Sequence, residues 1–149
     1  GGTEITGHFT SPPFQYQELR SEDPKVHTVL SSYDVLGGPS TFNCVWAPAS
    51  FRDDNPKAYE AFLAALDEAM QMIEADPAAA AQVYITQNNS KEDPAFIQEM
   101  IDDPEIEFVT APANSMKYAE FMHKVEAIKN RPESWQDYFF EEIHDLEGS

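Results

Sequence analysis

Two short segments hold residue types that bind small polar solutes. The first is Thr10-Ser11-Pro12-Pro13-Phe14, where two hydroxyls come directly before the expected first turn of a helix. The N–H groups of Phe14 and Gln15 would lack an intrahelical partner there and would attract carboxylate, sulfonate or phosphate oxygens. An ordinary capped turn uses the same residues, so this pattern by itself leaves both interpretations open.

The second segment is Gly37-Gly38-Pro39-Ser40-Thr41, which combines a flexible main chain with two neutral side-chain donors. Glycines let a main chain approach a ligand closely, and hydroxyls suit selective binding of a small polar solute. A plain loop between two strands is the alternative interpretation. The segment has neither the Gly-Lys-Ser/Thr of a P-loop nor the GxGxxG of a dinucleotide site.

Aromatic and ionisable side chains add fewer candidates. Phe14 and Tyr33 could stack on a solute or belong to the core, whereas Trp46 is expected in the core. His8, beside the first segment, is a candidate hydrogen-bond partner for a solute. The histidines and the single cysteine, Cys44, show no metal-ligand spacing, so we expect no metal site, no catalytic residue and no bound cofactor. The predicted ligand-binding residues are His8, Thr10, Ser11, Phe14, Tyr33, Gly38, Ser40 and Thr41.

Composition limits the classes of partner. The 149 residues include 27 acidic and 9 basic side chains, and the formal net charge of -18 repels phosphate backbones and anionic lipid heads. Nucleic-acid binding is therefore not expected. No run of about 18 apolar residues occurs, so direct insertion into a membrane is not expected either. Such acidity fits a saline source, where salt screens the repulsion.

The elements that must position these segments indicate an α/β fold, with a short sheet and helices in excess. Alternation and β-branched residues predict strands at 3–9, 26–33, 42–47 and 105–110, with Cys44 and Trp46 on a buried strand. Helical spacing and proline starts predict helices over 13–20, 56–73, 78–87, 94–101 and 115–128. So few strands cannot cover so many helices, which indicates a fragment whose missing strands complete the sheet.

A family resemblance covers essentially the whole chain. It lies in Gly1-Gly2-Thr3-Glu4-Ile5-Thr6, in His8 to Phe14, in Val29 to Phe42 and, near the end, in Ile128-Lys129, Trp135 and Ile143-His144-Asp145-Leu146. These segments resemble the second half of the periplasmic solute-binding proteins of ABC importers in the nitrate, sulfonate and bicarbonate group. The type that carries thiamine-pyrimidine precursors is the most similar.

The resemblance implies a partial periplasmic-binding-protein-like fold of type II, whose two lobes close on a small solute. Residues 1–24 would form a strand, turn and helix of the second lobe, 25–48 the crossover and strands, and 49–149 the mostly helical part of the first lobe. The N-terminal half would be missing. The resemblance also implies a periplasmic or extracytoplasmic location, delivery of the solute to an ABC permease, and binding without catalysis.

Two other functions stay open. Relatives of the thiamine-precursor type include enzymes that make the pyrimidine, and that route looks as though it needs an iron-binding set of cysteine and histidine. Cys44 is the only cysteine, which argues against this route. The remaining alternative is a stand-alone acidic interaction domain, which would show a large exposed apolar patch and no cleft.

Overall fold

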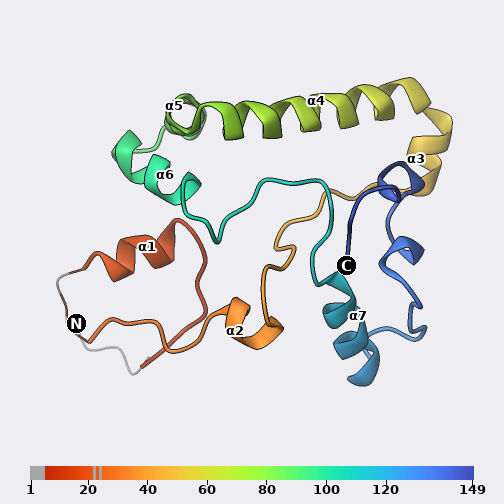
Figure 1. The fold of residues 1–149 in the computed structure, drawn as a ribbon, viewed down its shortest axis with the longest axis horizontal. Helices are drawn as coiled ribbons and strands as arrows, with labels where there is room; N and C mark the ends of the chain where they lie inside the picture. The colour runs from red at the N-terminus through yellow and green to blue at the C-terminus, as the bar shows by residue number, and fades with distance from the viewer. Residues whose placement is uncertain (1–5, 22, 24) are drawn as a thin grey trace. The chain divides into compact units, whose positions relative to one another are not determined.

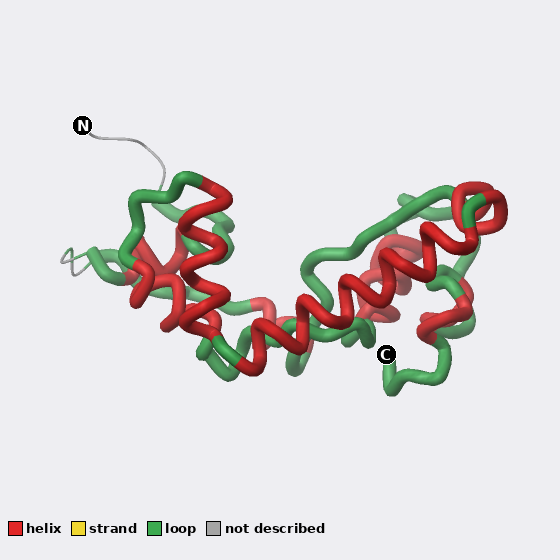
Figure 2. The backbone as a smooth tube through the Cα atoms, turned by 90° about the horizontal axis from the view of Figure 1, so that it is seen from above, coloured by secondary structure: helices red, strands yellow, loops and turns green. Residues whose placement is uncertain are grey.

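The structure is a computed structural model that describes residues 6–21, 23 and 25–149 (Figure 1). Over these residues the regular secondary structure is entirely helical, and no strand is formed (Figure 2). The helices of the described chain are α1 (Phe14–Leu19), α2 (Ser32–Leu36), α3 (Ala49–Asp54), α4 (Pro56–Ala75), α5 (Pro77–Asn88), α6 (Pro94–Ile101) and α7 (Ser115–Lys124), followed by the 3-10 helices η1 (Trp135–Asp137) and η2 (Glu141–Ile143).

The predicted α/β fold with a short sheet is therefore wrong for the described residues. The segments 26–33, 42–47 and 105–110 are loops, bends and turns, except that Ser32 and Tyr33 open α2. The predicted strand 3–9 lies partly outside the described residues, and its described part is loop. A strand needs the main-chain groups of a neighbouring strand. Within the described chain no ladder of main-chain hydrogen bonds joins any two of these segments.

The helix predictions are confirmed where a proline follows a small polar residue. Three helices begin at a proline: α4 at Pro56 and α6 at Pro94, as predicted, and α5 at Pro77, one residue before the predicted range. Asp76 caps α5 by accepting from the Ala79 N–H at 3.0 Å, and Asp93 caps α6 by accepting from the Ala95 N–H at 2.9 Å. These local bonds satisfy donors that a helix start leaves free, so nearby residues suffice to set the boundary.

Asn55, the residue before Pro56, contacts the preceding helix through its side chain. Its side-chain amide donates to the Phe51 carbonyl at 3.0 Å and so closes the last turn of α3. The N–H groups of Ala58 and Tyr59 donate instead to its main-chain oxygen, both at 3.0 Å.

The chain divides into two compact units, each made of two separate stretches of sequence. Unit 1 comprises Gly1–Val29 and Asp76–Ile106, with α1, α5 and α6. Unit 2 comprises Leu30–Ala75 and Glu107–Ser149, with the remaining helices.

Unit 1 has a small apolar core between α5 and α6. Its buried members are Ala81, Phe96, Ile97 and Met100. Helix α1 joins this core through two side chains. Tyr16 packs against the cluster and its hydroxyl donates to the Asp103 carboxylate, while Arg20 lies 4.1 Å from the centre of the Phe96 ring and pairs with Glu99.

Unit 2 buries less. Among its described residues only Pro112, Ala119 and Trp135 are buried, and the 20-residue helix α4 has no buried residue. Cys44 and Trp46, expected on a buried strand, are exposed, Trp46 to 85%. That expectation is wrong because residues 42–47 have no neighbouring strand to pair with, so they form a loop and their side chains stay exposed. The predicted helix 115–128 ends at Lys124, and its apolar side chains also stay largely exposed, at Tyr118, Phe121 and Met122 on α7 and at Val125 just after it.

The total accessible surface shows how much is left uncovered. The chain exposes 11619 Å², whereas even two separate compact domains of these sizes would expose only about 9,200 Å². Much of the excess is apolar, since large hydrophobic side chains from Phe9 to Leu146 are exposed. In unit 2, hydrogen bonds and helix caps, described below, therefore do much of the work of holding the segments together.

Removing the Tyr16 hydroxyl tests how strongly its hydrogen bond to Asp103 holds α1 against the core of unit 1. Tyr16→Phe keeps the ring packed but loses the bond to Asp103, so we expect the free energy of unfolding at neutral pH to fall by about 1 kcal/mol. Urea unfolding measures this value. Tyr84→Phe is the matched control, because the Tyr84 hydroxyl on α5 makes no hydrogen bond with the described residues.

The same pair makes a pH-dependent prediction. Burial, and then the bond to Asp103, raise the pKa of Tyr16, so its stabilisation is complete below the ordinary tyrosine pKa of about 10 and is lost above it. The bond from Tyr16 lowers the pKa of Asp103, so that stabilisation is present above about pH 3.9 and is lost at lower pH. In the Tyr16→Phe variant, the free energy of unfolding should change less with pH, both above about pH 10 and below about pH 3.9. An unchanged profile would contradict the role given to this bond.

Candidate functional site

The second predicted segment meets the start of α7 in unit 2. The Thr41 N–H donates to the Ala113 carbonyl at 2.9 Å, and the Ala113 N–H donates to Thr41 Oγ1 at 2.8 Å. The Asn114 side-chain amide donates to the Pro39 carbonyl at 2.6 Å. Three hydrogen bonds thus hold two loops together that lie more than 70 residues apart in sequence. We call the described residues 36–41 and 112–117 the loop junction.

Glycine conformation makes this junction possible. Gly37 ends α2 in the left-handed region with φ 72°, and Gly38 follows with φ 142°, a value that side-chain-bearing residues rarely adopt. These two turns direct the chain out of α2 so that Pro39 and Thr41 meet residues 113 and 114. The sequence analysis gave these glycines as a close approach to a ligand or as a plain loop between two strands; in the structure they follow the helix α2, and no strand flanks them among the described residues.

Lys117 brings a positive charge to the junction. Its ammonium donates to the Leu36 carbonyl, one of the last carbonyls of the five-residue helix α2, which lack intrahelical partners. A methyl group built on Gly37 would lie 3.6 Å from Lys117 Nζ, so the ammonium lies directly against the glycine turn. In a chain of net charge -18, this places one of nine basic side chains against the glycine turn after α2.

The first turn of α7 already binds an oxygen. Asn114 precedes the helix with φ 51° and makes no side-chain cap, because its amide is bonded to Pro39. The Ser115 N–H and Oγ instead both donate to the main-chain oxygen of Ser149, each at 2.7 Å. The Ser115 hydroxyl lies 2.8 Å from the Tyr138 hydroxyl, which must then be the donor of that bond. The helix start is thus built to receive an oxygen acceptor.

A packed aromatic group holds Ser149 in this place. Trp135 is buried and contacts Phe139 and His144 edge-on, with ring centres 5.9 and 5.7 Å away. Gly148 lies so close to the indole that a methyl group there would come within 2.7 Å of Trp135 Cε2. The Ser149 N–H then donates to the Pro112 carbonyl at 2.8 Å.

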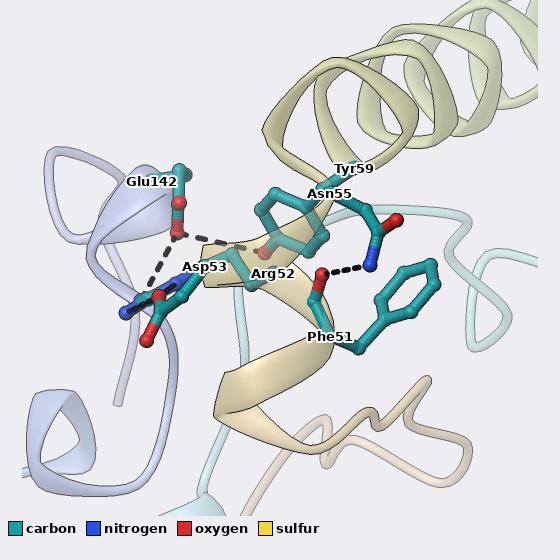
Figure 3. A network of polar contacts seen from close by, with 6 residues as sticks. All are labelled: Phe51, Arg52, Asp53, Asn55, Tyr59 and Glu142. Carbon is teal, nitrogen blue, oxygen red and sulfur yellow. Dashed lines mark hydrogen bonds and ion pairs between the residues drawn. The ribbon is translucent and has the colours of Figure 1, made fainter.

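A second polar cluster lies where α3, α4 and η2 meet (Figure 3). The Arg52 guanidinium donates to Asp53 at 2.9 and 3.0 Å, lies 4.0 Å from the Glu142 carboxylate, and covers the Phe140 ring at 4.7 Å. Tyr59 donates to Glu142 at 3.5 Å, and burial raises the pKa of Tyr59. The charged groups of this cluster pair with one another, and the cluster joins α3 to η2.

The predicted residues of unit 2 lie in or beside the loop junction. Tyr33 is on α2, half-buried, and the Gly37 and Gly38 N–H groups both donate to its carbonyl. Gly38 and Ser40 are half-buried in the loop, and Thr41 makes the reciprocal bonds to Ala113.

The predicted residues of unit 1 surround the start of α1. His8 Nε2 is 2.9 Å from the Glu18 carboxylate, Thr10 is exposed, and Phe14 opens α1 with 60% exposure. The expectation of an unpartnered Gln15 N–H is wrong, because this group donates to the Ser11 carbonyl at 3.3 Å. With only six residues, α1 also has a small dipole. The structure places these four residues in one unit and the other four in the other.

Sequence reasoning missed the contact of Lys117 with Leu36 and the two hydrogen bonds that Ser115 donates to Ser149. The sequence analysis placed positions 115 and 117 only within the predicted helix 115–128, where a charged residue ordinarily faces solvent. The available signal was local: a lysine two residues after Ser115 belongs to the first turn of the helix and lies on the same end as its free N–H groups.

Other parts of the described chain offer less. An open hollow of about 290 Å³ between α4 and residues 108–111 is lined by Asp67, Glu74 and Glu147, which disfavour an anion. No three histidine, cysteine, aspartate or glutamate side chains of the described residues gather in a way that could hold a metal ion. No helix of the described chain has the length and apolar character needed to cross a membrane.

Comparison with known protein families, with curated proteins and with solved structures gives no significant match.

Adding one methyl group at Gly148 tests whether the aromatic packing holds Ser149 in place. Gly148→Ala forces a contact with the Trp135 indole, so we expect a loss of about 1–3 kcal/mol in unfolding free energy. The Ser115 amide should also exchange its hydrogen faster, because its acceptor is displaced. Gly7→Ala is the matched control, since a methyl group there meets nothing within 4 Å. Equal stability of the two variants would show that the terminal segment is not held against Trp135.

Proposed function

We propose that this chain is the substrate-binding component of an ABC importer, and that the loop junction binds a small organic or anionic solute. The observation that carries the proposal is the meeting of a glycine and hydroxyl loop with a helix start that holds Lys117 and Ser115. The donors there are main-chain N–H groups, hydroxyls and one ammonium. This set matches the oxygens of nitrate, sulfonates or a hydroxylated pyrimidine precursor.

The position of Ser149 supports this choice of solute. Its main-chain oxygen receives both the N–H and the hydroxyl of Ser115, which is the arrangement that a carboxylate or sulfonate oxygen would take at a helix start. We propose that a solute oxygen exchanges with that oxygen and is then held near Lys117. The surrounding acidic chain repels anions at long range, so Lys117 supplies the local charge that makes binding favourable.

The sequence supports the proposed place of this activity in transport. The segments Val29 to Phe42 and Ile143 to Leu146, which resemble solute-binding proteins of importers, include or flank the residues of the junction. On this proposal the solute is delivered without chemical change to an ABC permease, and the protein acts outside the cytoplasm.

A second candidate function is an acidic interaction domain. The exposed side chains of Phe42, Val45 and Trp46 favour it, because contiguous exposed apolar residues commonly mark a surface for another protein. The two functions use different residues and so can be tested separately.

Lys117→Gln tests the proposed solute site. The whole chain is titrated with nitrate, ethanesulfonate and 4-amino-5-hydroxymethyl-2-methylpyrimidine, with binding followed by calorimetry and by the melting temperature. A bound solute raises the melting temperature with its concentration. We expect at least one of the three to do so, and Lys117→Gln to weaken it by about tenfold or more, through loss of a charged hydrogen bond.

The control is Lys124→Gln, which removes the same charge from the other end of α7 and should leave affinity unchanged. It separates a local contact from a change in net charge. Absence of binding by all three solutes, or equal weakening in both variants, would contradict the proposal.

A further inference from the structure

We propose that residues 42–46 form the contact of a symmetric dimer, in which this segment pairs antiparallel with the same segment of a second copy. The two-fold axis would pass at Cys44. This inference is independent of solute binding, because it uses none of the side chains of the loop junction.

The segment is open to pairing. It lies between α2 and α3 without helix, turn or bend (Figure 1). Its last tertiary main-chain bond on the N-terminal side is the one at Thr41, and the next N–H to find a main-chain partner is that of Phe51. Among the described residues, no hydrogen bond involves the main chain of residues 42–47. Unpaired N–H and C=O groups in such a segment accept a neighbouring strand.

Its side chains are apolar and exposed. Phe42 is 75% exposed, Val45 67% and Trp46 85%, and Cys44 is exposed as well. In a strand, Phe42, Cys44 and Trp46 would share one face, while Asn43 and Val45 would share the other. Covering these side chains gains the hydrophobic stabilisation that the single chain lacks.

The order of these residues selects a second copy as the partner. The pattern aromatic, Asn43, Cys44, Val45, aromatic is nearly symmetric about Cys44. Antiparallel pairing of Cys44 with Cys44 therefore sets Phe42 of each copy opposite Trp46 of the other, and this occurs twice. Aromatic pairs directly across two strands are among the favourable cross-strand contacts.

Charge determines when this dimer forms. Two copies of net charge -18 repel each other, yet Asp34 and Arg52 are the nearest charged residues on either side of the segment. The contact itself thus contains no like charges, and the repulsion is long-range and screened by salt. Edge segments that avoid pairing usually carry lysine or other charges, and this one carries none.

The area sets the expected strength. One fully buried aromatic side chain contributes about 150–250 Å², so Phe42 and Trp46, which would share a face, supply at most about 400 Å² per copy. This is less than the roughly 800 Å² per partner of a standard interface. A weak dimer that strengthens with salt is the expected result.

Sedimentation velocity of the whole chain over a range of sodium chloride and protein concentrations tests the proposal. We expect monomer at low salt and a rising dimer fraction at high salt. Trp46→Lys should abolish the dimer at all salt concentrations, and because Trp46 is exposed in the monomer, the helical circular dichroism should be unchanged. Val83→Lys makes the same charge change at another exposed apolar residue, on α5, and should leave the dimer intact.

Disulfide trapping tests the register. Copper–phenanthroline takes two electrons from two Cys44 thiols as they join, and a directly opposed pair of strand residues lies within disulfide reach. Wild type should therefore give a covalent dimer in high salt. Cys44→Ser with Val45→Cys moves the thiol to a position that does not face itself, and should cross-link at least about tenfold more slowly while still sedimenting as a dimer.

Three results would overturn the proposal: monomer at every salt concentration, a dimer that survives Trp46→Lys, or equal trapping at positions 44 and 45.

Discussion

The reciprocal hydrogen bonds between Thr41 and Ala113 fix the arrangement of unit 2. They join loops 72 residues apart in sequence, and the unit has few buried side chains that could do so instead. Once these loops meet, Asn114 turns to Pro39 and leaves the start of α7 without its own cap. That start then receives the Ser149 oxygen, and Lys117 reaches the end of α2. The candidate site is thus a consequence of how two loops are tied together.

In both units of this strongly acidic chain, an arginine joins the helices by contacting an aromatic ring and a carboxylate at the same time. In unit 1, Arg20 lies over the Phe96 ring and pairs with Glu99, and in unit 2 Arg52 lies over Phe140 near Glu142. Each guanidinium offers an apolar ring a favourable cation and offers a carboxylate a counter-charge. With only 9 basic residues against 27 acidic ones, such double use of a cation is an efficient way to join helices.

The exposed apolar segments explain why the sequence predicted a sheet that the described residues do not form. Residues 26–33, 42–47 and 105–110 have the residue types of strands, and the structure leaves them as loops with exposed side chains, apart from the two residues that open α2. Strand propensity describes how a side chain fits a pleated, half-buried surface, and it has no effect until a second strand supplies that surface. Exposed apolar loops are therefore the expected state of such segments without partners.

Local chemistry was readable from the sequence by itself. The starts of α4, α5 and α6 follow from a proline after Asn55, Asp76 and Asp93, because proline fixes its own φ and the aspartates reach N–H groups two or three residues away. The positive φ values of Gly37 and Gly38, by contrast, were seen only in the structure.

Only the tertiary structure decided the long-range pairs. It placed Lys117 against Gly37, gave the α7 start to Ser149, and separated His8, Thr10, Ser11 and Phe14 from the residues of the loop junction by assigning them to another unit. It also left Trp46 exposed, where its residue type predicted burial. The physical reason is that burial and strand pairing depend on which distant segments come into contact, and a local sequence pattern does not specify those contacts.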